Sequence, residues 1–335
     1  MKNKTLVKNG KLGELLRSRE VSLLMVLILL CAFIQFRNPA FLTPNVITGI
    51  FKNYAYTMVM AFGMMLVLLI GGIDISVGAT LAFSGMAGAL MMEKGILPNA
   101  LSVYLVTTVI GLACGLIIGL VISKGKVIPI IATLGFQYIY RGLTHAISGG
   151  RWVGTAYMLD DFKNFAQGSF LGINHLIWIT VVVFVVFLVF LKWSGFGRQI
   201  YAVGSNADAA KISGINNDWV TIAVYSINGA IAGLCGAMFT GYYATAQNDM
   251  GAGAEMDVIA ACVIGGVSLN GGQGSAVGVM LGAITVAVIS KSLSLVGIHA
   301  FWQQALKGGI ILLAVLINVL VQRANNRRAL EGREI

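Results

Sequence analysis

The sequence predicts an all-α polytopic membrane protein with about ten transmembrane helices, some of them broken, and with both termini in the cytoplasm. Hydrophobic residues make up 57% of the 335 residues and charged residues 11%, whereas soluble domains carry about 25% charged residues. The mean hydropathy is +0.85. Long, nearly continuous apolar runs exclude a β-barrel, because the strands of a barrel alternate polar and apolar residues.

The apolar runs can be divided into spans, because a helix needs about 20 apolar residues to cross a bilayer. The expected spans are about 20–36, 46–70, 75–92, 99–122, 128–148, 173–192, 219–246, 257–269, 275–297 and 302–321. The eighth of these is short enough to be re-entrant. Residues 1–20 form a basic N-terminal segment, 21–321 the transmembrane domain and 322–335 a basic tail.

Charged residues set the expected orientation. Most Lys and Arg lie in the two ends of the chain and in the connections 123–127 and 193–218. Acidic residues, Glu255 among them, dominate the connections on the other side. Cytoplasmic loops are rich in Lys and Arg, so both termini are placed inside. The net charge of +10 is therefore a topology signal and gives no reason to expect nucleic-acid binding.

A glycine-rich break lies between the second and third expected spans, in the run LLIGGIDISVG (68–78). Asp74 is the only carboxylate between Val21 and Met92, and a charge in a membrane helix costs roughly 2.5–3.5 kcal/mol on insertion scales. Interrupted apolar segments point to a transporter's substrate pathway. The alternative is an interfacial turn in which Asp74 caps the next helix. The pathway candidates in this break are Gly71, Gly72, Asp74, Ser76 and Gly78.

A second glycine cluster, GGVSLNGGQGS (265–275), follows the eighth span. It lacks the GxxxxGK[ST] spacing of a phosphate-binding loop, so ATP binding by this chain is not expected. VIGGVS (263–268) echoes LIGGID (69–74), which suggests either an old duplication or a repeated way of bringing broken helices together. The pathway candidates here are Gly265, Gly266, Ser268 and Asn270.

Charges within expected spans are functional candidates by default, although long side chains can also reach the membrane surface. These candidates are Arg141, Lys291 and Lys307. Lys307 is a possible partner of Asp74. No metal site is expected, because the four cysteines lie singly in apolar runs and the three histidines are scattered.

IGGIDISVG (70–78) resembles the signature of the ribose-type sugar permeases of ATP-binding-cassette importers, and the likeness continues along the chain. IPIIATLGFQYIYRG (128–142), GRQIYAVGSNADAAKISGI (197–215), DVIAACVIGGVSLNGGQGSAVG (257–278) and LKGGIILLAVL (306–316) follow in the same order and spacing. Within the family, ISGGRWV (147–153) and AACVIGGVSL (260–269) are most similar to the autoinducer-2 and rhamnose branch.

This resemblance implies a multi-pass permease of the bacterial cytoplasmic (inner) membrane, which is a transport subunit and not an enzyme. It also implies an extracytoplasmic substrate-binding protein, and a second copy of the chain or a related permease. The chain itself would hold no cofactor, because ATP and Mg²⁺ would bind to separate ATPase subunits. The substrate class would be a monosaccharide or a sugar-like molecule.

The polar connection 193–218 is rich in small residues, and a helix is expected to start after Asn206 as its N-cap. Small residues let another protein approach closely, so this connection is interpreted as a docking segment. The alternative is a plain solvated linker. In the family resembled, this loop couples the permease to the ATPase. The residues that match it are Gly197, Arg198, Tyr201, Gly204, Asn206, Ala209, Ala210, Ser213 and Gly214.

Two other function classes remain open on the sequence. One is an ion-coupled secondary transporter in which Asp74 would bind a proton or sodium. The other is a polytopic membrane enzyme, against which the loops offer no acid, base and nucleophile set.

Overall fold

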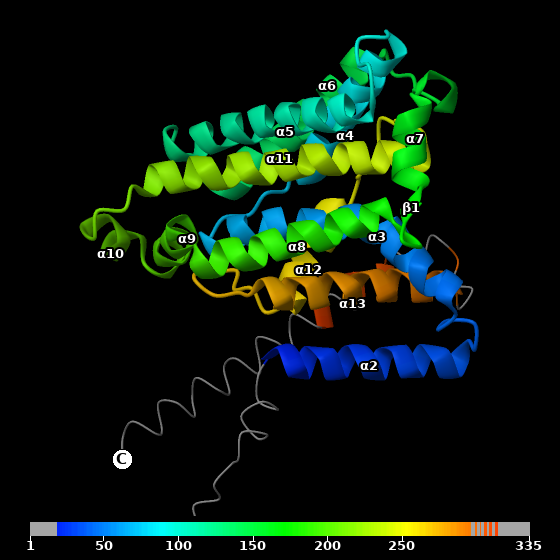
Figure 1. Ribbon diagram of the computed structural model, residues 1–335. Helices are drawn as coiled ribbons and strands as arrows, with labels where there is room; N and C mark the ends of the chain where they lie inside the picture. Colours follow the sequence, from blue (N-terminus) through cyan, green and yellow to red (C-terminus); the bar gives the residue numbers. More distant parts are fainter. Residues whose placement is uncertain are drawn as a thin grey trace, which may run out of the picture.

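The computed structural model describes residues 19–295 and single positions between 299 and 313. This part of the chain is almost entirely helical, with one two-stranded hairpin. Six of its helices are long and apolar enough to cross a membrane. Figure 1 shows most of the long helices running side by side, with α7 at one end of the bundle and α9 and α10 at the other. These are called the α7 end and the α10 end.

The helices lie close to the expected spans. Their bounds are α2 Arg19–Arg37, α3 Pro44–Leu69, α4 Val77–Glu93, α5 Ala100–Ser123, α6 Pro129–Ser148, α8 His175–Trp193, α11 Asn217–Tyr243 and α13 Ala276–Leu295. Proline opens α3 and α6, where its missing N–H costs nothing. Asn99 caps α5 by accepting a hydrogen bond from the amide of Ser102. The tenth expected span, 302–321, lies mostly outside the described residues.

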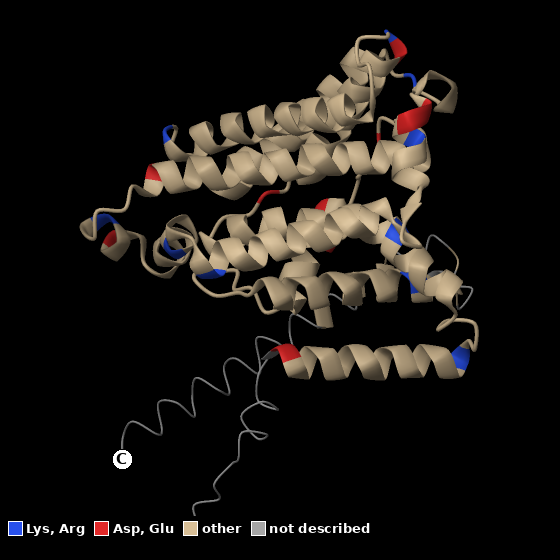
Figure 2. Ribbon diagram, in the orientation of Figure 1, with Lys and Arg blue, Asp and Glu red and all other residues tan. Residues whose placement is uncertain are grey.

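The polar connections carry short elements of their own. At the α7 end these are η1 Thr155–Tyr157, α7 Asp160–Gln167, β1 Ser169–Phe170 and β2 Ile173–Asn174. At the α10 end they are α9 Gly195–Ser205 and α10 Ala207–Ile212. Figure 2 shows the charged residues gathered mainly at these two ends, with long uncharged helix flanks between them.

The eighth expected span differs from the structure. Helix α12 is Ala254–Ile264, 11 residues, and at 1.5 Å per residue it is too short to cross a bilayer. Gly253 with φ 81° precedes it and Gly266 with φ 86° follows it. The helix is therefore flanked on both sides by glycines in the left-handed conformation. Glu255, expected in an outside connection, is only 7% exposed in its first turn.

Helices α5 and α11 pack backbone to backbone. Gly111, Gly115 and Gly119 recur every four residues along α5 and face α11. A Cβ on Gly115 would overlap the carbonyl oxygen of Tyr225, and one on Gly229 would overlap that of Gly111. Spaced small residues of this kind bring membrane helices into close contact, and they fix α11 as the central helix beside the α3–α4 break.

Large apolar side chains remain exposed on the outer helix flanks. Leu101, Leu105 and Val109 on α5 are 57–68% exposed, and Val182 and Val186 on α8 are 58% and 55% exposed. Apolar surface of this extent is unfavourable in water. It is the surface that a bilayer covers, in agreement with the polytopic membrane fold.

Candidate functional site

The break between α3 and α4 is organised around Asp74. Its Oδ1 accepts hydrogen bonds from the backbone amide of Ser76 at 2.9 Å and from the Ser76 hydroxyl at 2.5 Å. Its Oδ2 accepts a 2.7 Å hydrogen bond from Nδ2 of Asn228. All three residues are buried, with Asp74 2% exposed. The N-cap of α4 is Ser76 and not Asp74, so Asp74 binds the N-cap residue and also ties the break to α11; its place in a substrate pathway stays a prediction.

The break is also held by hydrogen bonds to the backbone carbonyl of the residue before Asp74. The hydroxyl groups of Thr133 on α6 and Tyr225 on α11 donate to the carbonyl oxygen of Ile73, at 3.2 and 3.4 Å. Irregular backbone is tolerated at membrane depth only where protein satisfies it, and three helices do so here. The proposed partner Lys307 lies outside the described residues, and Ser76 and Asn228 already occupy both carboxylate oxygens of Asp74.

The second glycine cluster repeats the backbone geometry of the first. The residues that are equivalent in geometry differ by one position from those that the sequence similarity between 69–74 and 263–268 pairs. Gly71, directly after the C-cap of α3, has φ 77°, and Gly266, directly after the C-cap of α12, has φ 86°. Gly71 donates to Leu68 and Gly266 donates to Val263, two peptide carbonyls in equivalent positions. The sequence alignment pairs Gly71 with Gly265, whereas the structure pairs it with Gly266.

The two breaks meet α9 at the α10 end. The amide of Gly272 donates a 2.9 Å hydrogen bond to the carbonyl oxygen of Leu69, the last residue of α3. A Cβ on Gly204 of α9 would overlap that same oxygen, and one on Gly271 would lie 2.8 Å from the carbonyl oxygen of Gly204. The Tyr201 hydroxyl donates to the carbonyl of Gly274 at 2.8 Å. We call this contact of α3, α9 and the 265–275 loop the glycine junction.

Other pathway candidates occupy the edges of this region. Ser268 donates its amide to the carbonyl of Gln273, and its hydroxyl accepts from the amide of Asn270, so both shape the 265–275 loop. Gly265 packs on Gly278 of α13, where a Cβ would meet the Gly278 carbonyl oxygen at 2.5 Å. A Cβ on Gly72 would lie 2.6 Å from the Tyr225 hydroxyl. Gly78 lies apart from the junction, at the start of α4.

The predicted helix after Asn206 is present. Asn206 caps α10 by accepting a 2.9 Å hydrogen bond from the amide of Ala209. Ala209 and Ser213 are exposed, and Ile212 is 88% exposed. Ile212 was not among the predicted residues, and an apolar side chain at the tip of a polar connection is the sequence signal that could have found it.

The remaining residues of the 193–218 connection serve its internal structure. Gly197 packs on α8, where a Cβ would lie 2.7 Å from the Phe190 carbonyl oxygen. Arg198 donates to the carbonyl of Trp193 at 3.5 Å. Ala210 is buried, and Gly214 has φ 83° in the turn after α10.

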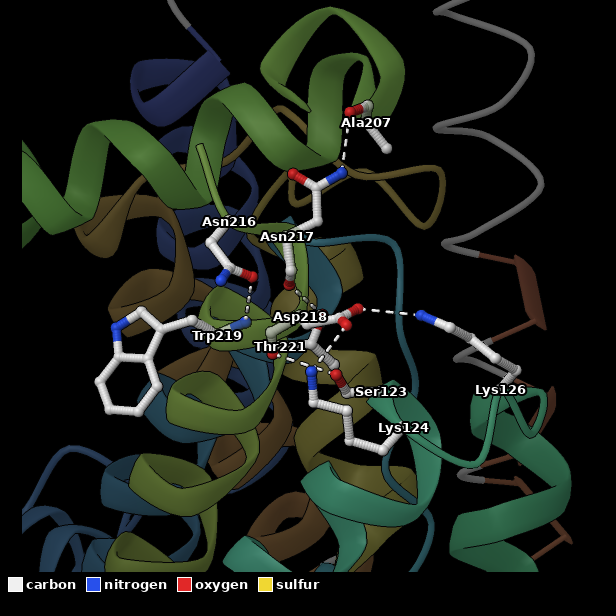
Figure 3. A network of polar contacts seen from close by, with 9 residues as sticks. All are labelled: Ser123, Lys124, Lys126, Ala207, Asn216, Asn217, Asp218, Trp219 and Thr221. Atoms are coloured by element: carbon white, nitrogen blue, oxygen red, sulfur yellow. Dashed lines mark hydrogen bonds and ion pairs between the residues drawn. The ribbon is translucent and has the colours of Figure 1, made fainter. Parts of the chain in front are cut away.

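A polar network joins α10 to the turn between α5 and α6 (Figure 3). Nδ2 of Asn217 donates to the carbonyl of Ala207 in α10 at 2.8 Å. The next residue, Asp218, accepts from Lys124 and Lys126 at 3.0 and 2.9 Å. A continuous chain of polar contacts therefore runs from α10 through the start of α11 to the segment that leads into α6.

Of the charges expected within spans, Arg141 has a defined environment. Its Nη1 donates to the carbonyl oxygens of Asn248 and Met250, at 3.0 and 2.9 Å. These bonds hold the chain segment that leads from α11 to α12. Lys291 lies near the end of α13 and is partly exposed, as expected for a side chain that reaches toward the membrane surface.

Broken helices whose ends are buried inside a bundle characterise membrane transport proteins. Comparison with known proteins gives the particular family. The family described as "Branched-chain amino acid transport system / permease component" matches residues 46–315, and the chain belongs to it.

Three relatives illustrate the likeness. The chain is 40% identical over 299 residues to the ribose import permease protein RbsC of Bacillus subtilis (strain 168), covering 87% of this chain and 90% of the relative. It is 34% identical over 317 residues to the L-arabinose ABC transporter permease protein AraH of Azospirillum brasilense (92% and 89%). It is 33% identical over 301 residues to the autoinducer 2 import system permease protein LsrC of Salmonella typhi (90% and 85%). No solved structure matches the chain.

Proposed function

We propose that this chain is the membrane-spanning permease of a bacterial ATP-binding-cassette importer for a monosaccharide or sugar-like molecule. The family match and the relatives named for ribose, arabinose and autoinducer-2 support this class. The protein sits in the cytoplasmic (inner) membrane with about ten spans and both termini inside. The α10 end faces the cytoplasm, and the cations Lys124, Lys126, Lys192, Arg198 and Lys211 in its connections agree with the positive-inside rule.

The glycine junction is the observation that carries the mechanism. Helix α9 touches the ends of both broken segments, through the backbone at Gly204 and through the Tyr201 hydroxyl, so a displacement of α9–α10 moves α3 and the 265–275 loop with it. Packed elements of this kind shift between discrete arrangements and do not deform continuously. The junction therefore converts movement of α9 and α10 into movement of the helices beside Asp74.

The partners follow from this role. ATPase subunits, with ATP and Mg²⁺ bound to them, dock on α10 through its exposed residues Ala209 and Ile212. A soluble binding protein delivers the substrate to the α7 end. A second permease copy, or a related chain, completes the pathway.

The ion-coupled alternative is not favoured, because fixed donors already bind both oxygens of Asp74. A proton or sodium site there would have to compete with Ser76 and Asn228. Asp74 is proposed to act as an anchor of the break and not as an ion ligand.

Uptake measured with and without ATP hydrolysis tests the function. Cells carrying the complete importer should accumulate labelled D-ribose, L-arabinose or autoinducer-2. That uptake should stop when the ATPase subunit carries an inactivating change in its ATP site, and it should persist after a protonophore while ATP is maintained. Uptake that survives the ATPase change but collapses with the protonophore would establish a secondary transporter instead.

A further inference from the structure

The N-termini of α4 and of the short helix α12 meet inside the bundle. Gly78 lies in the first turn of α4, and a Cβ there would overlap the carbonyl oxygen of Gly251 and lie 2.6 Å from Oε2 of Glu255. Gly251 precedes α12, and Glu255 is in its first turn. The start of α4 is therefore in direct contact with the start of α12.

Two contacts place this meeting point near the middle of the membrane helices. Arg141, just past the middle of α6, holds the carbonyls of Asn248 and Met250 directly before α12. Asn228, near the middle of α11, holds Asp74 directly before α4. Transporters place their substrates where half-helix N-termini converge near the bilayer midplane.

Glu255 differs from Asp74 in having an oxygen without a partner. The side chain is 7% exposed, and Oε2 is buried without a hydrogen-bond partner among the described residues. This oxygen points at the α-carbon face of Gly78. A buried acceptor without a donor destabilises a fold, so its retention calls for a partner supplied from outside the chain.

Arg141 supplies the complementary donors. Only its Nη1 is bound to the described carbonyls, which leaves Nη2 and Nε without acceptors in the described part of the chain. The carbonyls that Arg141 binds lie in the segment that leads into the first turn of α12, where Glu255 stands, yet the guanidinium forms no ion pair with a described carboxylate. One carboxylate oxygen of Glu255 and the remaining N–H groups of Arg141 therefore lie on adjoining segments without partners among the described residues.

We propose that Glu255 and Arg141 form a substrate-contacting site of the translocation pathway, which takes a neutral polyhydroxylated molecule. Each hydroxyl group of such a molecule both donates and accepts, so it can donate to Oε2 of Glu255 and accept from Arg141. The carboxylate and the guanidinium together carry no net charge, so the pair attracts neither a cation nor an anion over a neutral molecule. This assignment rests on the proposed function and names the residues that the sugar touches.

Glu255→Met is the decisive variant, because it keeps the side-chain length and removes the acceptor. Glu255→Gln keeps an acceptor oxygen, and Met256→Leu is the matched control at an adjacent position that is 53% exposed. ATP-driven uptake of labelled D-ribose and L-arabinose by the complete importer is measured together with the melting temperature of each purified permease. Glu255→Met should lower uptake at least tenfold while its melting temperature stays close to that of the wild type. Glu255→Gln should keep a larger share of uptake, and Met256→Leu should behave as the wild type.

The outcomes separate the site from the function. Normal uptake by Glu255→Met overturns the site while the proposed function stands. A fall in the melting temperature of Glu255→Met large enough to account for the lost uptake also overturns it, because the carboxylate would then act only in the fold. A wild-type importer that takes up neither sugar by ATP hydrolysis contradicts the proposed function for these sugars, and the site falls with it.

Discussion

The amide of Gly272 donates a 2.9 Å hydrogen bond to the carbonyl oxygen of Leu69, and this bond joins the two broken helix pairs of the protein. Leu69 ends α3 and Gly272 lies in the loop between α12 and α13. Because helix C-termini leave their last carbonyls without intrahelical partners, the bond satisfies an oxygen that would otherwise be orphaned. The same oxygen faces Gly204 of α9, so three elements share one carbonyl group.

Gly204→Ala should destabilise the glycine junction. The added methyl group would overlap the Leu69 oxygen and press on the amide of Gly272, and overpacking of this kind costs about 1–3 kcal/mol. The melting temperature of the purified permease should fall, and uptake should fall with it. Gly135→Ala is the control, because a Cβ at Gly135 would meet nothing within 4 Å. Equal melting temperatures for the two variants would contradict the junction.

Ala209→Trp and Ile212→Asp should block uptake without lowering permease stability. Both positions are exposed on α10, so the changes alter only the surface that the ATPase is proposed to contact. Co-purification of the ATPase with the permease measures the effect directly, and at least a tenfold loss is expected. Leu171→Ser, at the 77% exposed tip of the hairpin at the α7 end, should retain the ATPase. Retention of the ATPase by both α10 variants would exclude α10 as the docking surface.

Local rules predicted much of this arrangement from the sequence. Glycines and Asp74 marked the α3–α4 break, apolar length placed the helices, and Asn206 was expected to cap α10. The glycine junction could not be predicted in this way, because Leu69, Gly204 and Gly272 are far apart in the chain and no local preference brings their backbones together. Glu255 was assigned to an outside connection because the eighth span was expected to begin only at about residue 257, whereas α12 begins at Ala254 within the bundle.

Charge reversal should reveal the link between α10 and α6. In the wild type, Lys124 and Lys126 bind the Asp218 carboxylate at 3.0 and 2.9 Å. Asp218→Lys replaces that carboxylate by a third cation. These lysine side chains are 63% and 72% exposed, and exposed ion pairs contribute little to stability. Melting temperature should therefore change little, whereas uptake per ATP hydrolysed should fall several-fold.

Restoring the opposite charges provides the check on this link. Adding Lys124→Asp and Lys126→Asp to Asp218→Lys should recover most of the lost uptake, whereas those two changes in the wild-type background should impair it. Asp208→Asn on α10 is exposed and serves as the control. If the triple variant is no better than Asp218→Lys, the network does not transmit movement.

An Asp74 series should distinguish an anchor from an ion ligand. In Asp74→Asn the amide oxygen can still accept from Ser76, and the Asn228 amide can rotate to present its oxygen to the new NH₂ group. Asp74→Ala removes both acceptors and leaves buried donors on Ser76 and Asn228 unsatisfied, at about 1–3 kcal/mol each. Asp74→Asn should therefore keep most ATP-driven uptake and a near-normal melting temperature, whereas Asp74→Ala should lose both. Complete loss of uptake in a stable Asp74→Asn variant would show that the negative charge itself is required, and the anchoring role would be wrong.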